Sequence, residues 1–180
     1  MWIIGTIIII IGGAGVLTFN RLVKARNLVD EAWSGVDVQL KRRHDLIPNL
    51  VEAVKGYTGH ERTLLENIAQ QRTKAIEGDP QQDAQDENAL TRQVKTLFAV
   101  AEAYPDLKAN TTFLDLQQQL VKIEDDLQYA RRYYNGTVRD YNILVESFPS
   151  NLIAGLAGYR ADKFFQIEYA TERSAPDVAF

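Results

Sequence analysis

The sequence predicts an all-α protein in which a single N-terminal transmembrane helix continues into an antiparallel, up-down-up-down helical bundle with two long and two shorter helices. Three observations predict it: an uncharged apolar start, apolar residues repeated at intervals of three and four, and Gly or Pro residues that interrupt this repeat. We expect a transmembrane anchor at residues 1–20, the bundle at residues 21–148, and a C-terminal tail at residues 149–180 that is first apolar and then frayed.

The anchor is predicted from the uncharged run "WIIGTIIIIIGGAGVLTF", Trp2 to Phe19. At about 1.5 Å per residue it reaches roughly 27 Å, near the thickness of a bilayer hydrocarbon core. A cleaved signal peptide is the alternative, but it needs a basic residue before the apolar run and small residues after it. Here no Lys or Arg precedes the run, and Gly12 to Gly15 lie inside it. The pattern therefore favours a permanent anchor.

The flanks of the anchor predict its orientation. Arg21, Lys24 and Arg26 follow the apolar run, and no basic side chain precedes it. The positive-inside rule then places a short N-terminus outside and the C-terminal domain in the cytoplasm. We expect Trp2 and the three cations at the membrane interface. The absence of cysteine fits a reducing compartment.

The sequence also predicts which partners the protein binds. The lipid bilayer is the first predicted partner. Glycines in the apolar run, Gly5 and Gly12 among them, favour close helix packing and therefore a homo-oligomer. A membrane-protein partner is the other interpretation. No nucleic acid is expected, because the net charge is −4 and no basic face with interleaved aromatic residues appears.

The first bundle helix is predicted to leave the membrane without a break and to end at Gly56. "TGHE", Thr58 to Glu61, then reads as a capping box for the second helix, with His60 on the surface of its first turn. The first helix is predicted from apolar residues that step by three and four, namely Leu22, Ala25, Val29, Ala32, Val36, Leu40, Ile47, Leu50 and Val54.

Three further helices follow. The second is predicted to end at "GDP", Gly78 to Pro80, and the third to end at Pro105. Asn110 to Thr112 supply caps for the fourth, which has an apolar seam of period near 3.5 from Phe113 to Phe148. Its predicted length matches that of the soluble part of the first helix, so the two are expected to pair.

The tail "PSNLIAGLAGYRADKFF" is apolar and has two interpretations. Leu152, Ile153 and Leu156 contact the membrane or a neighbouring subunit, or they close the end of the bundle core. Both stay open on the sequence. The last residues, from about Ala170, look frayed.

The stretch "DVQLKRRHDLIPNL", residues 37 to 50, raises the question of a catalytic or metal site. Arg43 falls where a core residue is expected, so it is paired inside the bundle, reaches to an edge, or faces a partner. Pro48 predicts a bend, because it removes the hydrogen bond to the carbonyl of His44. We therefore count Arg43 and Pro48 among the candidate oligomer or partner contacts.

No constellation of residues in the sequence predicts catalysis. His44 and Asp45 point about 100° apart on a helix and do not chelate one ion. Neither HExxH nor the Glu-x-x-His motif of di-iron bundles is present. We therefore predict no catalytic residue, no cofactor and no metal site.

Two long blocks resemble the LemA family: "RLVKARNLVDEAWSGVDVQLKRRHDLIPNLVEAVKGYTGHE", residues 21 to 61, and "FLDLQQQLVKIEDDLQYARRYYNGTVRDYNILVESFPSNLIAG", residues 113 to 155. The resemblance implies a single-pass protein of the bacterial plasma membrane with an exterior N-terminus and an antiparallel helical domain. It implies no catalytic residues. One family member belongs to the magnetosome membrane, which implies a role in organising membranes.

Two functions are compatible with these features. The first is a membrane-anchored helical scaffold that self-assembles and organises or remodels the bilayer. The second is an adaptor that binds a membrane protease, transporter or signalling partner. An enzyme is the least favoured interpretation.

Overall fold

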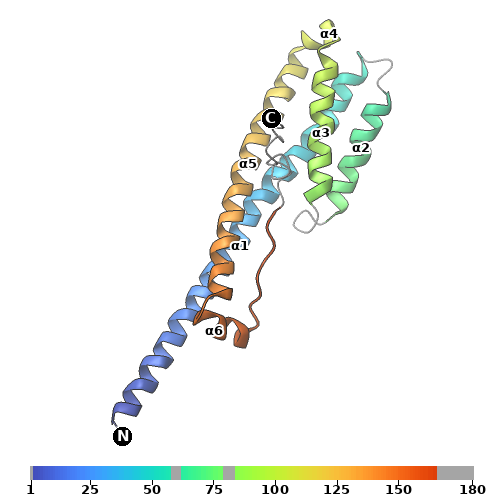
Figure 1. Ribbon diagram of the computed structural model, residues 1–180. Helices are drawn as coiled ribbons and strands as arrows, with labels where there is room; N and C mark the ends of the chain where they lie inside the picture. The colour runs from blue at the N-terminus through green and yellow to red at the C-terminus, as the bar shows by residue number, and fades with distance from the viewer. Residues whose placement is uncertain (1, 58–61, 79–83, 166–180) are drawn as a thin grey trace, which may run out of the picture. The chain divides into compact units, whose positions relative to one another are not determined.

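The computed structural model describes residues 2–57, 62–78 and 84–165, and within these ranges the chain is helical and contains no strand. The all-α prediction is confirmed. The helices of the described ranges are α1 (Trp2–Lys55), α2 (Arg62–Glu77), α3 (Ala84–Ala101), α4 (Pro105–Lys108), α5 (Thr111–Glu146) and α6 (Ser150–Ala157) (Figure 1).

The chain divides into two compact units, which we describe separately. In the described ranges, the first unit holds residues 2–38 and 128–164, and the second holds residues 39–127 and 165. The long helices α1 and α5 each contribute to both units, whereas α2, α3 and α4 belong to the second and α6 to the first.

In the first unit, α1 and α5 run antiparallel. The ring of Trp33 lies 5.3 Å from that of Tyr134, and the guanidinium of Arg26 lies 5.9 Å from the ring centre of Tyr141. Seven residues separate the two contacts on each helix, so the pair keeps one register. The predicted apolar repeat of α1 and the predicted seam of α5 supply the core. Its buried members include Leu22, Val29, Ala32, Val36, Tyr134, Val138 and Tyr141.

The second unit has the up-down-up-down order that the sequence predicts, over residues 39–127. The predicted bounds of the bundle, residues 21–148, stay a prediction. The second unit combines the C-terminal part of α1, the shorter α2 and α3, and the N-terminal part of α5 (Figure 1). Its core is one apolar cluster to which each of these helices contributes, and which includes Ile47, Leu50, Val54, Leu65, Ile68, Leu90, Leu97, Phe113, Leu116 and Leu120. The predicted cap of α5 is also present, since the side-chain oxygen of Asn110 accepts the amide of Phe113 at 3.0 Å.

Two short helices depart from the prediction. The third helix is predicted to end at Pro105, but α3 ends at Ala101. Pro105 instead begins α4, because proline suits the first turn, where its missing N–H is not needed. The apolar tail forms α6, which ends at Gly158 in the left-handed conformation with φ 79°. The predicted capping box at residues 58–61, including His60, the stop at Asp79 and Pro80, and the frayed end from Ala170 lie outside the described residues.

Candidate functional site

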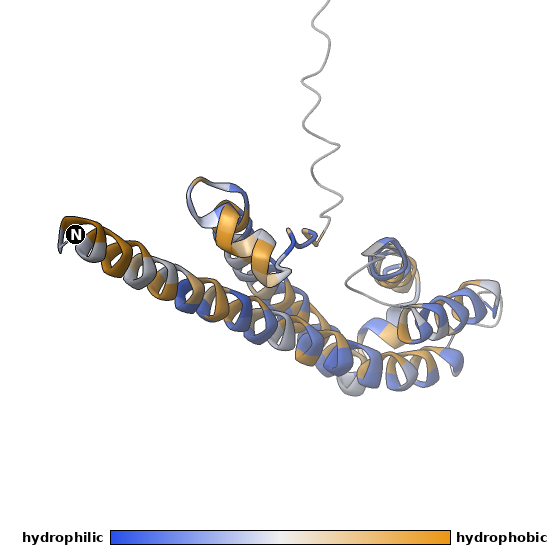
Figure 2. Cartoon of the chain, turned by 90° about the horizontal axis from the view of Figure 1, so that it is seen from below, coloured by the Kyte–Doolittle hydropathy of each residue, from blue (hydrophilic) through white to orange (hydrophobic). Residues whose placement is uncertain are grey.

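The first turns of α1 form an apolar surface that nothing in the described chain covers. Among the described residues, α1 is the helix long and apolar enough to cross a membrane, and none of its most apolar window is buried. Trp2 is 92% exposed and Leu17 is 67% exposed. Figure 2 colours this end of α1 as hydrophobic. The core helix of a soluble protein can be equally long and apolar, but it is mostly buried. The exposed apolar part of α1 therefore does not resemble such a helix.

The predicted glycine contacts lie on this surface. A Cβ atom added to Gly5 or Gly12 would meet no atom within 4 Å. Packing within the described chain therefore does not explain these glycines. Their predicted contact with another helix stays a prediction.

The three predicted interface cations differ in their surroundings. Arg21 and Lys24 are exposed. Arg26 instead donates to the carboxylate of Asp162 at 2.7 Å and pairs with Asp30 at 3.2 Å. Its charge is therefore partnered within the first unit, and a role for it at lipid headgroups stays a prediction.

The segment after α6, residues 159–164, runs back along the first unit and is fixed by side chains of α5. We call it the strap. The hydroxyl of Tyr141 donates to the carbonyl of Arg160 at 3.0 Å, and that of Tyr134 donates to the carbonyl of Lys163 at 3.1 Å. Asn142 exchanges two hydrogen bonds with Asp162, at 2.9 Å and 2.8 Å. Sequence reasoning counted both tyrosines as seam residues and missed the strap, because a seam position does not show what the hydroxyl contacts.

Helix α6 packs beside the last apolar turns of α1. A Cβ atom on Gly15 would lie 3.5 Å from Cδ1 of Ile153, and the rings of Phe19 and Tyr159 lie 6.3 Å apart. Ile153 is half-buried in this contact, and Ala154 is buried. The remaining apolar side chains of α6 point away, with Leu152 59% exposed and Leu156 90% exposed.

A buried polar cluster lies in the second unit, and its centre is Arg43. This side chain is 3% exposed, so the structure shows the first of the three alternatives for Arg43, pairing inside the bundle. Its guanidinium forms an ion pair with the carboxylate of Glu87, which is 1% exposed, donates to Oγ1 of Thr91 at 2.6 Å, and reaches Oε2 of Glu124 at 3.3 Å. Contact of Arg43 with a partner is not tested, but almost none of the side chain is accessible.

His44 completes the cluster from the next position of α1. Its Nε2 atom lies 3.0 Å from Oε1 of Glu87, which is ion-pair distance, although the alignment falls short of a hydrogen bond. Burial would raise the pKa of Glu87, but the polar contacts and charges of His44 and Arg43 outweigh it and lower the pKa below its ordinary value. Glu87 is therefore held as a carboxylate.

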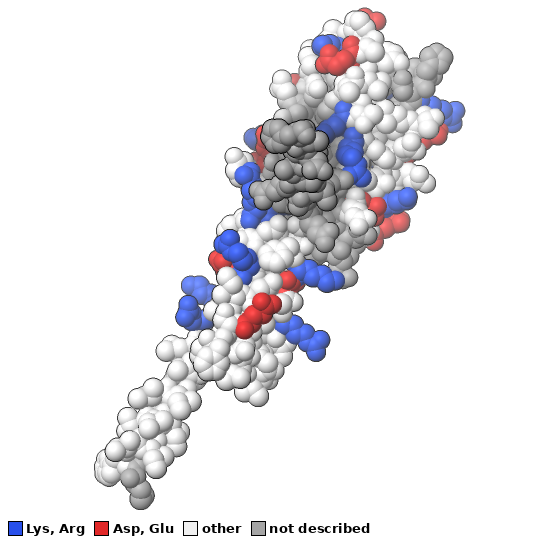
Figure 3. Space-filling view, in the orientation of Figure 1, with Lys and Arg blue, Asp and Glu red and all other residues white. Residues whose placement is uncertain are grey.

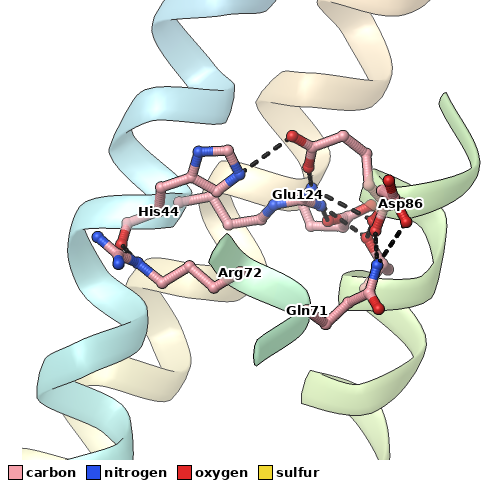
Figure 4. A network of polar contacts seen from close by, with 8 residues as sticks. His44, Gln71, Arg72, Asp86 and Glu124 are labelled. Carbon is pink, nitrogen blue, oxygen red and sulfur yellow. Dashed lines mark hydrogen bonds and ion pairs between the residues drawn. The ribbon is translucent and has the colours of Figure 1, made fainter. Parts of the chain in front are cut away.

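The carbonyl of His44 has a partner that the sequence did not reveal. Pro48 has no N–H to donate to this oxygen. In the structure Nε of Arg72, from α2, donates to it at 2.7 Å (Figure 4). Gln71, one residue earlier on α2, donates to the side chain of Asp86 at 2.9 Å (Figure 4). Side chains of α2 therefore bind both α1, at its proline, and α3.

The polar cluster is buried and its charges are paired from within. The carboxylate of Glu87 forms an ion pair with Arg43 and lies at ion-pair distance from His44, while Nε of Arg43, Nε2 of His44 and Oε1 of Glu87 have no hydrogen-bond partner among the described residues. Among the described residues, no group of three or more His, Asp or Glu side chains could hold a metal ion. Outside this cluster, four polar residues at intervals of four on α1 are exposed, namely Asp37, Lys41, Asp45 and Asn49.

Comparison with known proteins identifies a family. The model of the LemA family matches residues 32–180. Magnetosome protein MamQ 2 of Paramagnetospirillum magneticum is 24% identical over 83% of this chain and 65% of its own length. Protein LemA of Metamycoplasma hominis is 27% identical over 75% of this chain and 63% of its own length. Magnetosome protein MamQ of Magnetospirillum gryphiswaldense is 22% identical over 90% of this chain and 68% of its own length.

The chain thus spans about two thirds of the length of the curated relatives it matches. The family match nevertheless covers most of the chain and includes the C-terminal part of α1, the bundle, α6 and the strap. This chain belongs to the LemA family.

Proposed function

We propose that this protein is a single-pass, membrane-anchored helical scaffold that self-assembles and organises or remodels the bilayer, without catalysis. The observation that carries the proposal is the apolar start of α1, residues 2–19. None of its most apolar window is buried, and it continues into the rest of the helix without a break. At about 1.5 Å per residue this part reaches roughly 27 Å, which suits a hydrocarbon core roughly 30 Å thick.

Charge supports one orientation of this anchor. On the face drawn in Figure 3, no charged side chain lies over the first turns of α1, and Lys and Arg side chains appear beyond them. Arg21 and Lys24 are exposed there, which suits anionic headgroups. By the positive-inside rule, the helical domain lies in the cytoplasm and the N-terminal end of α1 lies outside the bacterial plasma membrane.

The scaffold role draws its support from several features. The uncovered glycines of the apolar segment allow another helix to approach closely. The similarity to magnetosome proteins adds an analogy, since those relatives are named for the magnetosome. The burial and internal pairing of Arg43 and Glu87 support a structural rather than a catalytic use of the bundle.

A pair of charged substitutions tests the anchor. Ile8→Arg with Ile9→Arg places two guanidinium groups in the apolar run, where each costs about 2.5–3.5 kcal/mol of membrane insertion. We expect the double variant to remain at the bottom of a flotation gradient while the parent floats with vesicles. Val38→Arg, at a 46% exposed position outside the run, is the matched control and should float. Flotation of the double variant like the parent would contradict the anchor.

The mass of the purified full-length chain in mild detergent tests self-assembly. We expect a particle that contains several copies of the chain. A monomer would contradict the scaffold and favour the alternative, an adaptor that binds a membrane protease, transporter or signalling partner.

A further inference from the structure

We infer that α6 is a second membrane contact: its exposed apolar side chains enter the lipid interface on the side of the membrane where the basic residues lie. The inference rests on the proposed anchor. The contacting residues are Leu152 and Leu156 of α6 and Phe148, two residues before the helix, and we call these three the α6 apolar patch.

Charged residues begin at the same level on three segments of the first unit. In the antiparallel register of α1 and α5, Arg21, the first charged residue of α1, lies level with Glu146, the last charged residue of α5. The ring of Phe19 packs 6.3 Å from that of Tyr159, and Arg160 is the next residue. Three segments of the first unit therefore change from charged to uncharged at one level.

Helix α6 lies on the uncharged side of that level. From Ser147 to Tyr159 the chain carries no charge. Ile153 lies against Gly15, six residues before Arg21 on α1, which is roughly 9 Å along the helix. An interfacial helix buries its apolar face about 5–10 Å below the headgroup boundary. An anchor that spans the membrane therefore carries α6 to the depth at which such helices lie.

The side chains of the α6 apolar patch are exposed. Phe148 is 79% exposed, Leu152 is 59% exposed and Leu156 is 90% exposed. Figure 2 colours α6 as predominantly hydrophobic, as it does the first turns of α1. The patch therefore adjoins the apolar surface of α1 that we assign to lipid. Contact with lipid removes both surfaces from water, which is favourable.

The contacts of α6 hold it in place for this role. Ala154 is buried and Ile153 packs on α1, so the helix presents its other side outward. The strap that follows is fixed to α5 by Asn142 and to α1 by Arg26, both through Asp162. These bonds set the depth of α6 relative to the anchor.

Tryptophan fluorescence in the full-length chain tests the inference. The native tryptophans, Trp2 and Trp33, are replaced by Phe, and a reporter is introduced by Leu156→Trp. The protein is placed in vesicles of phosphatidylcholine and phosphatidylglycerol in which part of the phosphatidylcholine carries bromine on its acyl chains. We expect a blue-shifted emission that brominated lipid quenches, most strongly when the bromine lies near the headgroup.

Three companion proteins make the outcome unambiguous. Phe148→Trp is a second reporter of the patch and should behave in the same way. Tyr129→Trp, at a 67% exposed position on α5, is the control and should not be quenched by lipid. A protein that keeps only Trp2 reports on the anchor and should be quenched.

Each other outcome overturns the inference in a different way. Unquenched, water-exposed emission from Leu156→Trp and Phe148→Trp, with Trp2 quenched, would reject the α6 contact and leave the anchor intact. Emission that is blue-shifted but insensitive to brominated lipid would show that a second copy of the chain covers the patch. Loss of quenching at Trp2 would reject the anchor itself.

Discussion

Arg43 stands at a position of α1 where the apolar repeat requires a core side chain. It is buried with Glu87, and the pair gains Thr91 and Glu124 as further partners of the guanidinium. Desolvation of two charges costs about as much as their attraction returns, so such a pair adds little net stability. We expect the pair instead to help define which helices pack together, because a different packing would leave a buried charge unpaired.

Removal of one charge from this pair should be far more damaging than removal of both. Arg43→Met leaves the carboxylate of Glu87 buried without its main partner, and we expect a loss of about 3–5 kcal/mol in the free energy of unfolding. Arg43→Met with Glu87→Met should recover most of that loss. Chemical denaturation of the full-length chain, followed by circular dichroism, measures both.

Arg62→Met is the matched control, because Arg62 forms an exposed ion pair with Glu66. It should leave the unfolding midpoint almost unchanged. A double variant no more stable than Arg43→Met would show that the two side chains do not act as a pair.

The lowered pKa of Glu87 predicts how stability depends on pH. A carboxyl group whose pKa is lower in the folded chain stabilises it fully above the unfolded value, near 4.5, and ceases to do so as the pH falls through the folded value. The parent should therefore be more stable than Glu87→Gln at neutral pH, and the difference should shrink below about pH 4.5. Unfolding midpoints of both proteins across this range measure it. A difference that stays constant down to low pH would contradict the assignment.

At the scale of the element, α1 continues through Pro48 because another helix supplies the missing donor. Arg72 of α2 donates to the carbonyl of His44 that the proline leaves free. We expect Arg72→Met to cost about 1–3 kcal/mol in the free energy of unfolding, because the carbonyl loses its charged donor.

The same substitution, Arg72→Met, is then made in a protein that also carries Pro48→Ala. The backbone N–H that this change restores at position 48 would donate to the carbonyl of His44, so Arg72→Met should cost less there than in the parent. Thermal or chemical unfolding of the four proteins gives the coupling between the two positions. Equal costs in both backgrounds would show that Arg72 acts elsewhere.

The long elements could be predicted from the sequence, and the short ones could not. Periodicity over many turns defines α1 and α5, and Asn110 marks the start of α5 by its capping chemistry. Helix α6 has few turns, and its apolar residues fit a core, a membrane or a neighbour equally well. The contact of Ile153 with Gly15 shows where that side chain packs, and the roles of Leu152 and Leu156 stay predictions.

The polar cluster shows a second limit. The sequence marks Arg43 as an anomaly, but its partner Glu87 lies in the first turn of α3, where an acid is already explained by the helix dipole. Arg72 has no pattern that ties it to Pro48. Tertiary partners of this kind depend on how helices are brought together, which no local pattern encodes.

At the scale of the whole molecule, self-assembly is the property that the apolar segment of α1 should control. Gly5 and Gly12 lie seven residues apart on one face of the helix, and a side chain at either would meet nothing in the described chain. Gly5→Leu with Gly12→Leu should leave the secondary structure unchanged and reduce the size of the assembly in detergent, because bulk keeps another helix at a distance.

Ala14→Leu is the matched control, because it adds bulk on the opposite face of the same helix. Its assembly should keep the parent's size. If both variants keep that size, the glycine face is not the contact.

Several copies of this chain should assemble on a membrane that α1 crosses. Electron cryomicroscopy of the full-length protein in a lipid bilayer observes both properties at once. We predict a particle of more than one chain, with residues 2–19 of α1 inside the bilayer and the rest of α1, with α2, α3 and α5, on one side of it. A single chain in the bilayer, or an assembly whose residues 2–19 lie outside the lipid, would contradict the claim.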